Sequence, residues 1–229
     1  MVTAARPGGP EDAVLGAVPR LVLEPATVEE AGEALAACAR DRLRVLFVGG
    51  GTDLELGRAP EGVDAVLRTS RLARVVEHVP ADQIVVAEAG LTLAELQRHL
   101  APHGQRLALD PPLAARATVG GAVAANAFGP RRCRFGASRD LVVGMTFVRA
   151  DGTVAKGGGK VVKNVAGFDV PRLLVGSLGT LAFIGTVTFR LHPLPEAAAT
   201  VAVAVPDAAR LRALAAAVVA AQLEPVAFA

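Results

Sequence analysis

The stretch VLFVGGGTDLELG, residues 45–57, has the composition of an anion-binding loop. Its apolar run, Val45–Val48, predicts a short buried strand. The three glycines Gly49–Gly51 follow this run and precede Thr52 and Asp53. Glycine in ordered structure costs conformational entropy, so a triplet indicates backbone that turns sharply or approaches another group closely. Open N–H groups at such a strand end can cradle a phosphate. A plain tight turn, capped by the Thr and Asp side chains, is the alternative.

Four later motifs follow this loop in a fixed order. They are Asp-Pro at 110–111, Thr-Val-Gly-Gly at 118–121, RFGASRD at 134–140 and GSLGT at 176–180, which leads into a strand. Each motif alone is a weak signal. Together with the glycine loop, and at these spacings, they make residues 20–195 resemble the FAD-binding domain of the vanillyl-alcohol oxidase / p-cresol methylhydroxylase (PCMH) family.

This resemblance implies a cofactor site in which backbone N–H groups of the glycine loop hold the FAD pyrophosphate and the later motifs line the rest. A core strand position is the alternative role for Ile184, and a helix C-cap is the alternative for Asn126. The implied cofactor-binding residues are Val48, Gly49, Gly50, Gly51, Thr52, Asp53, Pro111, Thr118, Gly120, Gly121, Asn126, Gly136, Ser138 and Ile184.

The mode of FAD attachment also follows from the resemblance. Some members of the family hold FAD covalently through His or Cys, and the glycine loop contains neither. We therefore expect non-covalent FAD, with Cys133 as a weaker candidate for a covalent link. Lys160 or Lys163 could stabilise reduced, anionic flavin, and solvated lysines are the alternative. No motif identifies a catalytic residue or a metal site.

Within the family, the segment AGFDVPRLLVGSLGT at 166–180 is most similar to the FAD-binding E subunit of bacterial glycolate oxidase, although Leu178 stands where many relatives have Glu. The resemblance implies that FAD accepts a hydride equivalent from a small 2-hydroxy acid such as glycolate and passes electrons to a separate acceptor. Two cysteines, Cys38 and Cys133, cannot supply the four thiolates of an ordinary iron–sulfur cluster. The electrons must therefore pass to a separate iron–sulfur subunit, to a quinone or to a soluble acceptor. The resemblance implies an iron–sulfur subunit and a second flavin subunit as partners.

Two other functions stay open. The chain could be a non-catalytic scaffold, with or without FAD, that stabilises a catalytic paralogue. It could also be another flavoenzyme of the same fold, such as a sugar-nucleotide reductase.

The helices and strands expected from the sequence, which must position these residues, indicate an α+β fold. Capping boxes at Thr27–Glu30 and Thr92–Glu95 begin two helices, and Asp151-Gly152 predicts a hairpin turn. We expect a loose leader over 1–20, a two-subdomain PCMH-type domain over 21–195, and the start of a truncated α/β substrate or cap domain over 196–229. The last part is predicted as a strand, a helix capped by Asp207 and the start of another strand. In the main domain the expected strands cover 21–25, 45–48, 65–68, 74–78, 84–88, 106–110, 144–150, 153–156 and 181–192.

Composition excludes several other classes of protein. The 229 residues carry a net charge of only +2, no Trp or Tyr and no dense basic block, which disfavours nucleic-acid binding. No apolar run reaches the roughly 18 residues of a membrane span, and the N-terminus does not resemble a signal peptide. The two distant cysteines do not form a disulfide framework, so we expect a cytoplasmic protein. Peripheral attachment to the inner membrane through partners is left open.

Overall fold

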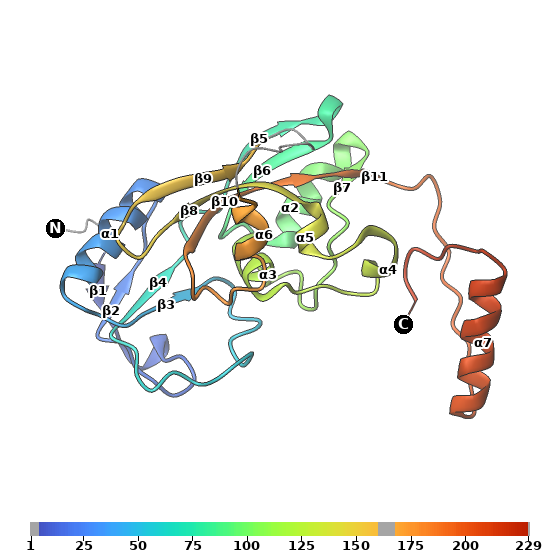
Figure 1. Cartoon of the computed structure of the whole chain (residues 1–229), viewed down its shortest axis with the longest axis horizontal. Coiled ribbons are helices and arrows are strands. Elements are labelled where there is room, and N and C mark those ends of the chain that lie inside the picture. Colours follow the sequence, from blue (N-terminus) through green and yellow to red (C-terminus); the bar gives the residue numbers. More distant parts are fainter. Residues whose placement is uncertain (1–4, 160–167, 229) are drawn as a thin grey trace.

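The computed structural model describes residues 5–159 and 168–228 and shows strands and helices arranged in an α+β fold (Figure 1). Its strands form a four-stranded, a five-stranded and a two-stranded sheet. The first two sheets correspond to two halves of one domain, and the cavity described below lies where they meet. The predicted fold class is confirmed.

The first sheet has the strand order β1 (Ala5–Pro7), β2 (Leu21–Leu23), β4 (Ala65–Arg68) and β3 (Val45–Val48). Strands β2, β4 and β3 are parallel, as expected of strands joined by a crossover. The crossover between β2 and β3 contains helix α1 (Val28–Arg40).

Helix α1 begins where the sequence predicts. The Thr27 hydroxyl oxygen accepts a hydrogen bond from the Glu30 backbone N–H at 3.1 Å, while the Glu30 carboxylate accepts from the N–H of Ala26 at 2.8 Å, one residue earlier than the predicted capping box. The buried face of the helix includes Ala31 and Leu35, which share a core cluster with β2 and β4 and with Phe183 of the second sheet. Helix α1 therefore helps to join the two sheets.

Residues 5–20 are part of the fold, so the predicted loose leader is wrong for this stretch. Strand β1 pairs antiparallel with β2, and η1 (Pro10–Asp12) places the Asp12 side chain in the interior. The sequence Ala-Arg-Pro has no strand pattern, and it becomes a strand because β2 offers an open edge.

The second sheet is antiparallel, with the order β5 (Val75–Val79), β6 (Ile84–Glu88), β10 (Phe183–Arg190), β8 (Val142–Val148) and β9 (Val154–Gly158). The last pair joining β8 to β9 is Val148 with Val154, so the connection is longer than the predicted Asp-Gly turn. Gly152 still provides its positive φ of 87°.

Four helices share the core of this sheet: α2 (Leu93–Leu100), α3 (Val119–Ala125), α5 (Ser138–Leu141) and α6 (Val170–Leu174). The predicted capping box of α2 is confirmed. The Thr92 hydroxyl oxygen accepts from the Glu95 N–H at 3.2 Å, and the Glu95 carboxylate accepts from the Thr92 N–H at 3.3 Å.

The predicted strand at 106–110 is wrong except for its first residue. Only β7 (Gln105–Arg106) is a strand, paired with β11 (His192–Pro193) in the two-stranded sheet. The backbone N–H and C=O of Leu107 are instead bonded by the side-chain amide of Gln97. That side chain satisfies the backbone groups that a neighbouring strand would otherwise pair. The remaining short elements are η2 (Pro80–Asp82), η3 (Ala101–His103) and α4 (Arg132–Phe135).

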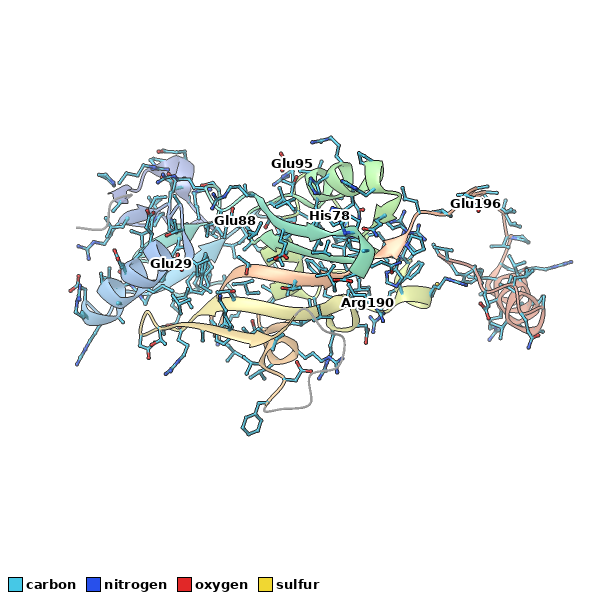
Figure 2. All side chains as sticks on the ribbon, turned by 90° about the horizontal axis from the view of Figure 1, so that it is seen from above. Glu29, His78, Glu88, Glu95, Arg190 and Glu196 are labelled. Carbon is cyan, nitrogen blue, oxygen red and sulfur yellow. The ribbon has the colours of Figure 1, made fainter. Side chains whose placement is uncertain are left out.

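The C-terminal part leaves the sheets after β11. Figures 1 and 2 show that the chain passes Glu196 and forms helix α7 (Ala208–Ala220), which stands apart from the sheets. After α7 the chain turns back, and Glu224 pairs with Arg134 of α4 at 3.2 Å (Figure 1). Asp207 caps α7 as predicted, accepting from the Arg210 N–H at 2.8 Å. The strand predicted before α7 does not form, because residues 197–205 meet no strand edge. The domain boundary near 196 stays a prediction. No described helix is long and apolar enough to cross a membrane.

Candidate cofactor site

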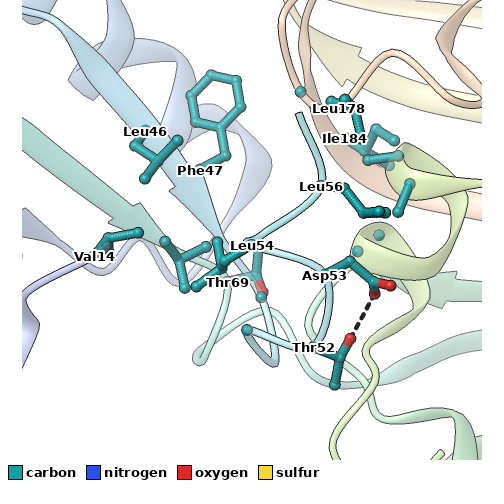
Figure 3. Close-up of a pocket in the computed structure, with 18 of the residues that line it drawn as sticks. Val14, Leu46, Phe47, Thr52, Asp53, Leu54, Leu56, Thr69, Leu178 and Ile184 are labelled. Carbon is teal, nitrogen blue, oxygen red and sulfur yellow. Dashed lines mark hydrogen bonds between the residues drawn. The ribbon is translucent and has the colours of Figure 1, made fainter. Parts of the chain in front are cut away.

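A cavity of about 420 Å³ lies at the carboxyl end of β3, between the two large sheets (Figure 3). The glycine loop, residues 49–53, forms one side of it. The first turn of α3 and the start of β10 form another. The structure thus brings together motifs that lie more than one hundred residues apart in the chain. The predicted site residues that line the cavity are Val48, Gly49, Gly50, Gly51, Thr52, Asp53, Gly120, Gly121 and Ile184.

Each of the three glycines of the loop is required for a structural reason. A Cβ atom on Gly49 would overlap the Thr118 hydroxyl oxygen, and a Cβ on Gly50 would overlap the backbone carbonyl oxygen of Arg116. Gly51 has a φ of 68°, the left-handed region that glycine enters without strain. The first two glycines therefore let the loop pack against the segment before α3, and the third turns the chain.

The backbone N–H groups of the loop are open. Among the described residues, those of Gly50, Gly51, Thr52 and Asp53 donate to no protein acceptor. A row of unpaired N–H groups in a turn is a concave site for an anion such as a diphosphate. The Thr52 hydroxyl is engaged with the Asp53 carboxylate at 2.6 Å (Figure 3). The backbone, rather than this hydroxyl, is the open donor set.

Helix α3 does not offer a second set of open donors. The N–H groups of Val119 and Gly120 donate to the carbonyls of Leu91 and Ala89, and the N–H of Gly121 donates to the Thr118 hydroxyl at 3.3 Å. Gly120 is needed for close packing, because its Cβ would lie 2.6 Å from that of Ala89. The start of α3 is therefore a wall of the cavity rather than an anion cradle.

Five predicted site residues lie outside the cavity lining. Thr118 is the N-cap of α3, and Asn126 is its C-cap with a φ of 50°, which is the alternative role considered for Asn126. Gly136 has a φ of 80° and lies against Asp140, while Pro111 and Ser138 are buried. Lys160 and Lys163 lie outside the described residues.

Several buried polar atoms without a protein partner lie in the predicted motifs or the cavity lining. Among the described residues they are the side-chain oxygens of Asn126, Ser138 and Ser177 in the motifs and the hydroxyl oxygen of Thr69 in the lining, while four others lie on Arg68, Arg106, Arg190 and His192. Buried polar atoms in folded proteins normally have a hydrogen-bond partner, so each exception needs an explanation. Thr69 lines the cavity, where a polar ligand would satisfy its hydroxyl.

Sequence reasoning missed Thr69, although a signal for it exists. Thr69 directly follows β4, as Gly49 follows the adjacent parallel strand β3. The carboxyl ends of neighbouring parallel strands lie at one edge of a sheet and commonly form ligand sites. Sequence reasoning also missed Val14 and Leu15, which reach the cavity from the N-terminal segment.

The chemistry of the lining fits a dinucleotide cofactor. Asp53 and Arg58 are its only charged residues among those described, and apolar side chains flank the open N–H groups on both sides. This pattern suits a diphosphate between two planar, largely apolar groups. The described lining contains neither His nor Cys.

Histidines gather elsewhere in the fold. The rings of His78 and His103 have centroids 4.8 Å apart, and His99 lies 5.3 Å from His78. Burial, together with the two neighbouring imidazoles, lowers the pKa of His99. No group of three or more His, Cys, Asp or Glu in the described ranges is arranged to hold a metal ion.

Comparisons with known proteins agree with this cavity. The sequence model of the FAD binding domain family matches residues 19–158. D-lactate dehydrogenase of Archaeoglobus fulgidus is 38% identical over 175 residues, which are 76% of this chain and 39% of that protein. Glycolate oxidase subunit GlcE of Escherichia coli is 33% identical over 173 residues, 75% of this chain and 48% of that subunit.

A third relative and a solved structure agree as well. Glycolate oxidase subunit GlcD of Bacillus subtilis is 31% identical over 179 residues, 78% of this chain and 38% of that subunit. The structure of an alkyldihydroxyacetonephosphate synthase shares the fold, with a TM-score of 0.69 and 22% identity over 80% of this chain and 33% of that one. This chain spans less than half the length of each of these proteins.

The match covers the glycine loop and the first turn of α3, the same segments that the structure brings together around the cavity. The open N–H groups and the unpartnered Thr69 hydroxyl are consistent with a bound dinucleotide. The chain belongs to the family of FAD binding domains, and FAD is its cofactor.

Proposed function

We propose that this chain is the FAD-binding part of an oxidoreductase that oxidises a small 2-hydroxy acid, such as glycolate or D-lactate. The observation that carries the proposal is the row of open N–H groups at Gly50–Asp53 inside a mostly apolar cavity. The names of the relatives support the substrate class, because they include a D-lactate dehydrogenase and two glycolate oxidase subunits.

The residues of this chain bind and orient the cofactor. FAD, when bound, supplies the acceptor for a hydride equivalent from the substrate carbon. The glycine loop holds the diphosphate by its N–H groups, and we place the flavin ring toward Ile184 and the start of β10. Phe183 and Ile184 are buried there and exclude water from that end of the cavity. We expect FAD to be held without a covalent bond.

We propose that the group that removes the substrate hydroxyl proton lies outside this chain. Asp53 is the only carboxylate in the described lining, and it already accepts a hydrogen bond from Thr52. A general base must reach the proton directly or through one water molecule. We propose that a partner or another part of the protein supplies this base and much of the substrate pocket.

The partners proposed are an iron–sulfur subunit, which carries electrons onward, and a second flavin subunit. Both cysteines of the chain are free, Cys38 in the interior and Cys133 at the surface. We place the assembly in the cytoplasm, with attachment to the inner membrane through its partners as the alternative.

A scaffold role within such an assembly is the second candidate function. Helix α7 favours it, because none of its residues is buried although many are apolar. An exposed apolar surface of this kind commonly marks a protein contact.

The test is a spectroscopic titration. The purified chain, reconstituted with FAD, should show flavin absorbance, and anaerobic glycolate or D-lactate should bleach it once the partner subunits are added. Bleaching at catalytic rates by the isolated chain would contradict the proposed outside base. Bound flavin that neither substrate reduces in the full assembly would favour the scaffold.

A further inference from the structure

The cavity has a wall that lies outside the matched family domain. The family match begins at residue 19, yet Val14 and Leu15 line the cavity. Both belong to residues 5–18, here called the N-terminal segment, which comprises β1, η1 and the turn that follows. Its contribution to the cavity therefore comes from residues that the family match does not cover.

An ion-pair cluster holds the N-terminal segment to the first sheet. Asp12, only 1% exposed, accepts two hydrogen bonds from the Arg6 guanidinium at 2.7 and 2.8 Å, one from Arg68 at 3.1 Å and one from the Gly9 N–H at 3.1 Å. Arg68 is the last residue of β4 and directly precedes Thr69 of the cavity. The cluster, here called the Asp12 clamp, thus ties the segment to the strand end that meets the cofactor.

The turn after the clamp presents a leucine to the cavity. Val14 and Ala17 exchange backbone hydrogen bonds of 2.9 and 3.0 Å, which close the turn. Leu15 and Gly16, between them, have φ values of 49° and 84°. A left-handed leucine is uncommon, and Leu15 is 44% exposed although it lines the cavity. The turn therefore holds the apolar Leu15 side chain at the cavity, where the rest of the protein covers it only in part.

The position of this turn indicates which half of the cofactor it meets. Val14 packs in the core of the first sheet, while Ile184 belongs to the core of the second. Figure 3 shows Val14 on the side of the cavity away from Leu178 and Ile184, with Leu54 between them. With the diphosphate on the glycine loop and the flavin ring toward Ile184, the adenosine half extends toward the N-terminal segment.

We propose that the N-terminal segment is a cofactor-binding element in which Leu15 packs against the adenine of FAD and the Asp12 clamp fixes that contact. An apolar side chain against the face of a purine is stabilised by removal of both surfaces from water. The element would favour FAD over FMN, which lacks the adenosine half. The inference rests on the proposed placement of the flavin ring, and the experiment below distinguishes a failure of that placement from a failure of the Leu15 contact.

The first variant is Leu15→Gly, with the dissociation constants of FAD and ADP measured by titration. Glycine suits the positive φ, so the melting temperature of the cofactor-free protein should not fall. Loss of the apolar contact should raise both constants by about five- to tenfold. The matched control is Leu113→Gly, because Leu113 has a φ of 55°, is 58% exposed and is absent from the cavity lining. It should leave both constants within about twofold of the parent.

The second variant is Asp12→Asn, which removes the charge of the clamp. It should weaken FAD and ADP binding in the same proportion as each other. Its control, Asp64→Asn, makes the same change in a carboxylate paired with Arg44 at 2.9 Å, at the opposite ends of β3 and β4 from the cavity. If Asp12→Asn does not fold, Leu15→Gly decides alone.

The outcomes separate the two levels of inference. If the parent binds no FAD, the cofactor assignment fails. If the parent binds FAD and Leu15→Gly binds FAD and ADP as tightly, the N-terminal segment is only a structural cover and the proposal is wrong. If Leu15→Gly weakens FAD but not ADP, the turn meets the flavin half, and the proposed orientation of the cofactor is wrong.

Discussion

Replacing Gly50 by alanine tests the link between the glycine loop and the segment before α3. The added Cβ would lie well inside van der Waals contact with the Arg116 carbonyl oxygen. That oxygen belongs to the backbone and cannot rotate away, so the two loops must separate. Overpacking of this kind typically costs about 1–3 kcal/mol. In a chain of this size we expect the melting temperature of the cofactor-free protein to fall by about 2–12 °C.

Two other glycines separate this steric effect from backbone strain. Gly51 has a φ of 68° and Gly104 a φ of 66°, so Ala at either position has a similar conformational cost of roughly 1–2 kcal/mol. Added Cβ atoms there meet only ordinary or no contacts. Gly104→Ala should lower stability without changing FAD affinity, because Gly104 is remote from the cavity lining. Gly51→Ala should lower stability and also weaken FAD binding, because Gly51 belongs to the glycine loop that lines the cavity.

The assays are thermal unfolding of the cofactor-free protein and FAD titration of each variant. We expect Gly50→Ala to lose stability before any cofactor is added and to bind FAD more weakly. A cofactor-free Gly50→Ala protein that melts at the parent temperature would refute the packing explanation. If that variant also bound FAD normally, the loop would be a plain turn.

Three further predictions follow from the site and its surroundings. Thr69→Val should weaken FAD binding by about fivefold, since its buried hydroxyl lacks a protein partner, whereas Thr188→Val, buried on β10 away from the cavity, should not. Heat or acid should release the flavin into the supernatant, and a yellow pellet would instead show a covalent bond. Burial and the cations of Arg190 and Arg106 lower the pKa of His192 below its unfolded value near 6.5. The folded protein therefore binds a proton at His192 less readily than the unfolded chain does. This residue contributes stability above about pH 6.5, and that contribution is lost as the pH falls below it. A melting-temperature profile from about pH 7 to pH 5 should decline less in His192→Gln, and equal declines would exclude this role.

The sequence predicted the elements whose signals are local. Strands β3, β4 and β6 have the predicted bounds, because each is an apolar run closed by Gly, Pro or polar residues. The N-caps of α1, α2 and α7 were also predicted, since a capping side chain bonds within its own turn.

The elements that were missed depend on distant partners. Strand β1 exists because β2 has an open edge, and Asp12 is buried because Arg6 and Arg68 converge on it. The same limit applies to the site. The glycine triplet predicted an anion loop, but its need for Arg116 and Thr118 as neighbours is visible only in three dimensions.

The central claim is that the open N–H groups of Gly50–Asp53 hold the diphosphate of FAD. Amide hydrogen exchange, measured with and without FAD and with ADP, tests it most directly. We predict that both ligands slow exchange at these four amides, while those of Val119 and Gly120, already paired within the protein, change little. FAD that binds in a one-to-one ratio and leaves exchange at Gly50–Asp53 unchanged would contradict the claim.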